Sequence, residues 1–229
     1  MSDWFEARVA SVIPAAEGLV HVSLDVPKEV AASHVAPGQY LKVATEGAGE
    51  GFFAIASRPD PSADRVQLLL KLGGAAADAV AHLPAGSAVR TTAAQGKGFP
   101  LDRAVGRDLV LVATGSGISP MRSVIEAVIP RRGDFGVVSL YFGARTPRSF
   151  AFEESFDAWR TAKIEVFPVV SQPQDTGWTG LTGYVQSHLG GVHLSTGIAF
   201  LCGQKGMVAA VREALGTLGM PADSMYLNF

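Results

Sequence analysis

The clearest chemical signal in the sequence is a glycine-rich turn that follows an apolar segment. Thr114-Gly115-Ser116-Gly117-Ile118-Ser119-Pro120 comes directly after the apolar residues 109–113 and opens a predicted helix. Glycines let a backbone turn tightly and approach a ligand closely, and the amides at a helix start favour an anion. We expect a diphosphate there, and an ordinary strand-to-helix turn is the alternative. The third glycine of the usual dinucleotide fingerprint is absent.

A second turn lies near the C-terminal end, where the apolar residues 199–202 lead into a predicted helix. Cys202 stands at the end of this segment, and the carboxyl ends of parallel strands are where ligands collect. Its thiol is either a nucleophile or a small buried side chain, because no adjacent histidine is there to activate it. Arg145, at the end of another predicted strand, is either a contact for a 2′-phosphate or a surface residue.

The two halves of the chain differ in how their apolar residues are spaced. Residues 4–100 give short β-rich segments at 5–13, 19–26, 39–45, 52–57 and 65–72, with one helix at 75–82, which predicts an antiparallel barrel or sandwich. Residues 104–229 alternate strands at 109–113, 137–142, 164–170 and 199–202 with helices at 120–129, 150–161, 184–189 and 207–218. Such alternation predicts an α/β domain with a doubly wound, mostly parallel sheet.

Composition narrows the class of protein. The 229 residues are 48% hydrophobic and 17% charged with a net charge of −2, which favours a packed core and argues against nucleic-acid binding. No apolar run approaches the roughly 20 residues that a membrane-spanning helix needs. The single cysteine excludes an internal disulfide and a four-thiolate cluster, and the five histidines have no metal-ligand spacing. The first ten residues do not resemble a secretory signal, so we expect a cytoplasmic protein.

The second half resembles the nucleotide domain of the ferredoxin–NADP reductase family of flavoproteins. That family has a Gly-Thr-Gly-x-x-Pro turn, matched by residues 115–120, and a Tyr-Gly-Ala-Arg strand end, matched by Phe142-Gly143-Ala144-Arg145. Its late Cys-Gly-x-x-x-Met turn is matched by Cys202, Gly203 and Met207, and residues 170–185 resemble the loop after its third strand. These motifs occur in the family's order. A small plant plastid branch called fruit proteins is the most similar part of the family.

The first half resembles the family's flavin-binding barrel less closely. Residues 37–40, Pro-Gly-Gln-Tyr, match a strand entry, but the flavin motif Arg-x-Tyr-Ser falls on Gly51-Phe52-Phe53-Ala54. Phe53 still offers a ring for stacking, whereas Gly51 supplies no charge and Ala54 no hydroxyl. Arg58 is a candidate replacement for the charge. Lys71, Gly73, Gly74 and Ala75 would form the second flavin element, unless they are a plain turn before an alanine-rich helix.

The resemblance implies an antiparallel β-barrel domain that binds FAD, residues 1–103, followed by an α/β domain that binds NADP or NAD, residues 104–229. It implies an NAD(P)H-dependent flavin oxidoreductase that moves a hydride between the pyridine nucleotide and the flavin. Thr114, Cys202 and Phe229 would lie near the reacting rings, with Phe229 shielding the flavin unless it is a frayed end. The other implied cofactor-binding residues are Phe53, Ala54, Ile55, Ala56, Ser57, Lys71, Gly73, Gly74, Ala75, Gly115, Ser116, Gly117, Ile118, Ser119, Pro120, Arg145, Gly203, Gln204 and Met207.

Two further interpretations stay open. Because of Gly51 and Ala54, the chain could be a nucleotide-binding or regulatory module that has lost efficient flavin chemistry. The other alternative is an electron-transfer subunit of a larger complex. The electron acceptor, a small molecule or a redox protein, is unknown from the sequence. Away from the motifs, we expect Trp159 in the core, Trp178 as a loop anchor or a nucleotide contact, and His34 and His82 at the surface or at helix ends.

Overall fold

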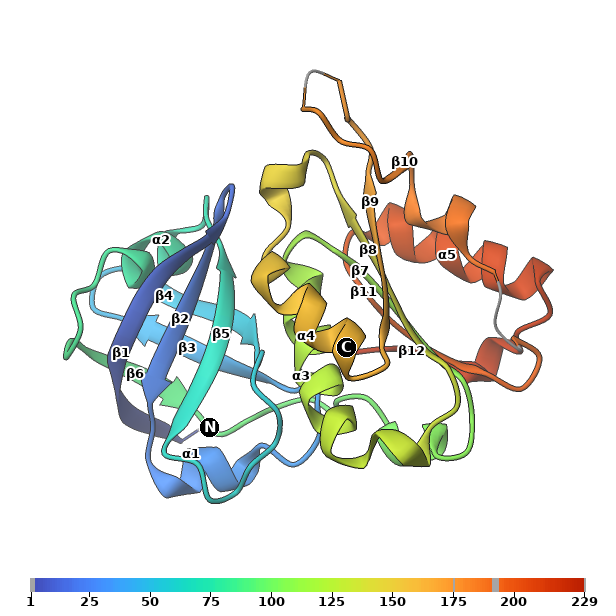
Figure 1. Ribbon diagram of the computed structural model, residues 1–229. Helices are drawn as coiled ribbons and strands as arrows, with labels where there is room; N and C mark the ends of the chain where they lie inside the picture. Colours follow the sequence, from blue (N-terminus) through green and yellow to red (C-terminus); the bar gives the residue numbers. More distant parts are fainter. Residues whose placement is uncertain (1–2, 175, 191–193, 229) are drawn as a thin grey trace.

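The computed structural model describes residues 3–174, 176–190 and 194–228. It contains two six-stranded sheets, one in each half of the chain (Figure 1). The N-terminal sheet is antiparallel and the C-terminal sheet is parallel, which confirms the predicted fold class. In this described part, no helix combines the length and the apolar character that crossing a membrane requires.

The N-terminal sheet curls into a barrel in the order β4-β3-β6-β1-β2-β5. Its two edge strands meet through an isolated bridge between Ile55 and Leu68, just beyond the end of β4. Irregular pairing at Val9/Ser11 and Pro14/Ala16 lets the long first strand bend, as bulges do. The elements are β1 (Trp4–Ala16), β2 (Leu19–Asp25), α1 (Lys28–Ser33), β3 (Tyr40–Thr45), β4 (Gly49–Ala54), β5 (Arg65–Lys71), α2 (Ala75–Ala81) and β6 (Ala88–Thr92).

The parallel sheet has the order β10-β9-β8-β7-β11-β12 and helices on both faces. Alternate residues of its central strand face opposite sides: Leu109 and Leu111 join one core cluster, while Val110 and Val112 join another. The first cluster lies under α3 and α4, on the side of the barrel, and the second under α5 (Figure 1). The elements are β7 (Leu109–Thr114), α3 (Ile118–Val128), β8 (Val138–Ala144), α4 (Phe156–Thr161), β9 (Glu165–Val170), β10 (Leu181–Thr182), β11 (Ile198–Cys202), α5 (Lys205–Thr217) and β12 (Met225–Leu227).

Several elements differ from the sequence-based expectation. The elements α1, β6, β10 and β12 were not predicted. The helix expected over residues 150–161 is regular only over α4, because Phe152 adopts a left-handed conformation with φ 62°. The helix expected at 184–189 is a short 3₁₀ turn over Val185–His188. Trp159 is buried in the core, as predicted.

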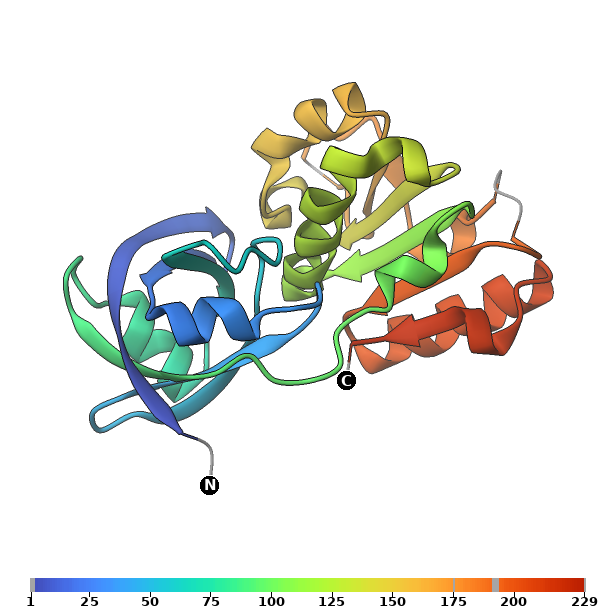
Figure 2. The ribbon, with the colours of Figure 1, turned by 90° about the horizontal axis from the view of Figure 1, so that it is seen from below.

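The two domains share an apolar seam. One core cluster combines Leu19, Ala56 and Leu69 of the barrel with residues of the parallel sheet and its helices. Phe99, in the segment that connects the domains, stacks on Phe200 of β11 with ring centroids 4.6 Å apart and an interplanar angle of 10°. A view from below follows this connection across the seam (Figure 2). The boundary between residues 103 and 104 stays a prediction.

Candidate functional site

The glycine turn after β7 lies against the turn after β11. Gly115 has a positive φ of 55°, and a Cβ added there would meet nothing within 4 Å. Glycine is therefore favoured at this position for its backbone conformation and not for lack of space. Gly117 serves a different purpose, because a Cβ there would overlap the Cys202 carbonyl. The two motifs that the sequence places about ninety residues apart therefore form one surface, at the carboxyl edge of the sheet.

A side-chain hydrogen bond joins the same two turns. The Oγ1 of Thr114, the last residue of β7, accepts the main-chain N–H of Gln204 at 3.2 Å. A Cβ added at Gly203 would overlap this hydroxyl and the end of Met207. Thr114, Gly203, Gln204 and Met207 are thus brought together, as the sequence predicts for residues around one ligand.

Cys202 lies at the centre of this arrangement, buried beneath it. Its side chain is among the buried residues of the core cluster, and burial raises the pKa of its thiol to about 12. A thiol with that pKa stays protonated at neutral pH, so the geometry favours the small buried side chain over the thiolate nucleophile. No group of metal-ligating residues was found in the described part of the chain.

The end of β4 reaches the glycine turn from the barrel side. The Oγ of Ser119, in the first turn of α3, donates to the Ala54 carbonyl at 2.8 Å. Ile55 and Ala56 continue the segment as buried residues, and the hydroxyl of Ser57 accepts the Gln67 N–H at 3.1 Å. Residues of the expected flavin motif therefore lie beside residues of the expected nucleotide turn.

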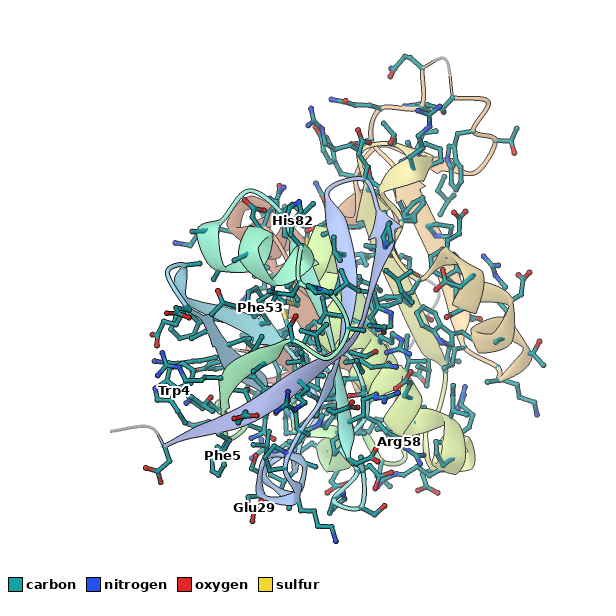
Figure 3. The ribbon with its side chains drawn as sticks, turned by 90° about the vertical axis from the view of Figure 1, so that its left-hand side faces the viewer. Trp4, Phe5, Glu29, Phe53, Arg58 and His82 are labelled. Carbon is teal, nitrogen blue, oxygen red and sulfur yellow. The ribbon has the colours of Figure 1, made fainter. Side chains whose placement is uncertain are left out.

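Phe53 is more enclosed than the sequence suggests. It belongs to the barrel core and is 9% exposed. Its ring covers the Cα of Gly51, since a Cβ added at Gly51 would overlap this ring and touch Ala76 of α2. The Phe53 ring thus fills space that an arginine at position 51 would need. Figure 3 shows Phe53 among the strands of the barrel.

The second expected flavin element keeps an open surface but carries an acidic group. Gly73 and Gly74 have free space where a Cβ would lie, and Lys71 and Ala75 are exposed. The Gly73 N–H, however, donates to the Asp78 carboxylate at 2.8 Å. A phosphate placed here would meet one lysine and one carboxylate.

One predicted contact lies at the margin of the site. Arg145 is exposed just beyond β8, and none of the ion pairs or hydrogen bonds among the described residues involves its guanidinium. Its main-chain carbonyl accepts the Gln172 N–H at 2.8 Å, which ties it to the loop after β9. Phe229 lies outside the described residues.

Arg58 does not replace the missing charge at Gly51. It faces a different part of the seam, where a cavity of about 540 Å³ is lined by four cationic side chains, those of Arg58, Lys97, Arg103 and Arg131. Figure 3 shows Arg58 well away from Phe53. Apart from Arg58, none of the residues predicted to bind a cofactor lines this cavity.

The remaining sequence expectations have clear outcomes. Trp178 packs against the core cluster and donates its Nε1–H to the Leu181 carbonyl at 2.9 Å, so it anchors its loop. His82 is exposed at the end of α2. His34 caps the end of α1, which is one of its two predicted positions, and it is buried there with 2% of its surface exposed.

The end of β4 in a β-barrel therefore lies against the glycine turn of a parallel α/β domain, which is the arrangement expected of a two-domain, nucleotide-dependent reductase. Comparisons with known proteins agree. Residues 111–213 match the model of the oxidoreductase NAD-binding domain. The fruit protein pKIWI502 of Actinidia deliciosa is 28% identical over 98% of this chain and 77% of its own length. Ferredoxin–NADP reductase B of Sorangium cellulosum is 28% identical over 98% of this chain and 96% of its own length.

Solved structures show the same fold. A ferredoxin NADP⁺ reductase from Neisseria gonorrhoeae, crystallised with FAD and NADP, superposes with a TM-score of 0.82 at 21% identity and covers 100% of both chains. Along its whole length the chain is thus similar to ferredoxin–NADP reductase-like oxidoreductases, as its motifs predict.

Proposed function

We propose that the protein is an FAD-dependent NAD(P)H oxidoreductase that moves a hydride between a pyridine nucleotide and flavin and passes electrons to an external acceptor. The observation that carries the proposal is the contact between Ser119 and Ala54. It puts the end of the flavin strand beside the start of the nucleotide helix. Residues 1–103 would bind FAD and residues 104–229 the nucleotide.

The glycines of the two turns leave room for a dinucleotide to approach the backbone, and the FAD diphosphate would find less charge here than the family supplies. Open space lies at the glycines of both turns, 73–74 and 115. Phe53 is enclosed in the barrel core and offers a flavin only the small exposed part of its ring, and Lys71 is the cation at the second expected flavin element. Since Gly51 adds no charge and Asp78 holds the Gly73 amide, we expect FAD to be held weakly.

The chain's own residues would act by binding and orientation. The amides of residues 115–119 would hold the nucleotide diphosphate, and Arg145 would meet its ribose or a 2′-phosphate. Thr114, Gly203 and Gln204 would set the position of the nicotinamide, while the neutral Cys202 thiol would keep water from the ring. When bound, flavin supplies the two-electron chemistry, and the protein supplies proximity.

The test is a cofactor titration of the purified protein. Added FAD should give a yellow protein whose tryptophan fluorescence is quenched, and anaerobic NADPH or NADH should bleach the colour. Gly203→Leu should prevent bleaching, because its side chain would displace Thr114, while FAD is still taken up. A chain that never takes up FAD at millimolar concentration would contradict the proposal.

A regulatory nucleotide-binding module is the second candidate, and the contact between Asp78 and the Gly73 amide favours it. Such a module would bind NADPH without FAD, which equilibrium dialysis with each ligand separates from the first candidate. The family includes proteins that are reductase components. A partner that co-purifies in fixed ratio would therefore make this chain the electron-transfer subunit of a complex.

A further inference from the structure

One face of α3 binds the backbone of the segment that extends the flavin strand. Ser119, Arg122, Ser123 and Glu126 recur at the i, i+3, i+4 and i+7 spacing that places side chains on a single helix face. We call these four residues the α3 clamp. They point away from the apolar residues by which the same helix packs on the parallel sheet.

Each residue of the clamp has a main-chain partner between residues 54 and 58. Ser119 Oγ donates to the Ala54 carbonyl at 2.8 Å, and Ser123 Oγ to the Ser57 carbonyl at 2.7 Å. The guanidinium of Arg122 donates to the Ala56 carbonyl at 3.3 Å, and the Glu126 carboxylate accepts the Arg58 N–H at 3.1 Å. Four directional bonds therefore hold five consecutive residues.

The two serines of the clamp are buried, and its two charged residues are partly buried and paired with each other. Ser119 and Ser123 are 1% and 0% exposed, and Arg122 and Glu126 form an ion pair at 2.7 Å. Burial lowers the pKa of Arg122 and raises that of Glu126. Arg122 also donates to the Gln67 amide oxygen at 2.6 Å and lies 4.8 Å from the centroid of the Phe152 ring. Because residues 54–58 form these hydrogen bonds with α3, the segment cannot move along the helix without breaking them.

The partners are backbone atoms, so the clamp is insensitive to the side chains at positions 54, 56 and 57. The same helix begins at the glycine turn after β7, at Ile118. The clamp therefore fixes two features that lie in different domains: the end of β4 and the phosphate turn.

We propose that the α3 clamp is a positioning device that sets the flavin segment and the nucleotide turn in one fixed relation before either ligand binds, with Ser119 as its positioning residue at the reacting end. The reaction that it serves rests on the proposed function. The fixed relation of the domains does not, because it is formed by protein atoms alone. Domain closure around the nucleotide is therefore not part of the catalytic cycle.

The structural arm of the test uses the apo protein. Spin labels on cysteines introduced at Glu29 of α1 and Asp157 of α4, both exposed, report the distance between the domains. The wild-type background should give one narrow distance distribution that NADP⁺ and FAD do not shift. Ser119→Ala with Ser123→Ala should broaden it. The matched control is Thr217→Ala, which removes a hydroxyl-to-carbonyl bond of α5 far from the seam and should leave the distribution narrow.

The kinetic arm uses protein loaded with FAD. At saturating NADPH, Ser119→Ala should slow flavin reduction roughly 10-fold or more, because small misplacements of reacting groups are costly. The dissociation constants for FAD and NADPH should stay within about twofold of wild type, because the Ser119 hydroxyl is engaged by the Ala54 carbonyl and alanine keeps the main-chain amide assigned to the nucleotide. In the Thr217→Ala variant the flavin should be reduced at the wild-type rate.

The outcomes separate the two claims. A narrow distribution in the double variant, or a broad one with an unchanged reduction rate, would overturn the positioning proposal. If wild-type protein takes up no FAD, the proposed function fails together with the reaction assigned to the clamp, while the distance measurement still decides whether the clamp fixes the domains.

Discussion

At the scale of single residues, Gly115 and Gly117 are required for different reasons. Gly115 adopts a positive φ with open space around it, whereas Gly117 lets α3 approach the Cys202 carbonyl. From sequence alone both glycines serve a ligand. In the structure, Gly117 is needed for the packing of the two turns, so a substitution there should lower the stability of the fold even when no ligand is present.

We expect Gly117→Ala to lower the free energy of unfolding by about 1–3 kcal/mol, the usual cost of forcing extra atoms into a packed site. Urea unfolding without ligand measures it. Gly216→Ala is the matched control, because this exposed helical glycine of α5 has nothing within 4 Å of an added Cβ. It should stabilise the protein by about 0.5–1 kcal/mol. A Gly117→Ala protein as stable as wild type would show that the two turns do not touch.

At the scale of elements, β4 and α2 form a closed packing unit where the family has a flavin-binding arginine. The ring of Phe53 lies over Gly51, and the Ala76 Cβ lies beside the same glycine. An arginine introduced at position 51 would therefore overlap the Phe53 ring, whether or not its guanidinium could reach a phosphate.

A double-mutant cycle tests this packing. Gly51→Ala should destabilise the wild-type protein by about 1–3 kcal/mol through overlap with Phe53. In a Phe53→Ala background the same change should cost clearly less, because only the 3.0 Å contact with the Ala76 Cβ remains. Equal effects in both backgrounds, measured by urea unfolding, would argue against the overlap.

The sequence predicted best those elements whose apolar pattern is unbroken. The strands β7, β8, β9 and β11 were found because a buried parallel strand is continuously apolar. The helix expected over residues 150–161 had correct apolar spacing, yet its first turn failed because Phe152 takes a left-handed conformation. Short segments such as β6 carry too few residues for a period to show.

The site could be predicted from the motifs in part. Thr114, Gly117, Cys202 and Gln204 meet as expected, since the carboxyl ends of parallel strands share one edge. The clamp residues of α3 were not identified, except Ser119, which was assigned to the cofactor. Their polar helical spacing was visible, but their partners are backbone atoms of another domain, which no side-chain pattern encodes.

At the scale of the whole molecule, a buried histidine couples the fold to pH. His34 is 2% exposed, and its Nε2 has no hydrogen-bond partner. Burial lowers the pKa of His34 to about 4, whereas an unfolded chain binds this proton below about pH 6.5. The unfolded state therefore holds more protons between pH 6.5 and 4, and stability must fall as the pH decreases through that window.

We expect this histidine to account for about 3 kcal/mol of lost stability at the acid end of the window. Urea unfolding at several pH values, on wild type and His34→Leu, measures it as the difference between the two slopes. The variant should be at least as stable at pH 7, because it removes an unpaired buried nitrogen. Parallel pH profiles for the two proteins would contradict the assignment.

The stacked rings of Phe99 and Phe200 make the two halves of the molecule dependent on one another. Barrel residues Leu19, Ala56 and Leu69 belong to the same cluster as the sheet and α3, so the hydrophobic core does not stop at the connection between the domains. If the chain were cut at this connection, each fragment would expose an apolar surface to water. Neither domain can therefore be replaced by a homologous domain unless the replacement has a complementary apolar surface.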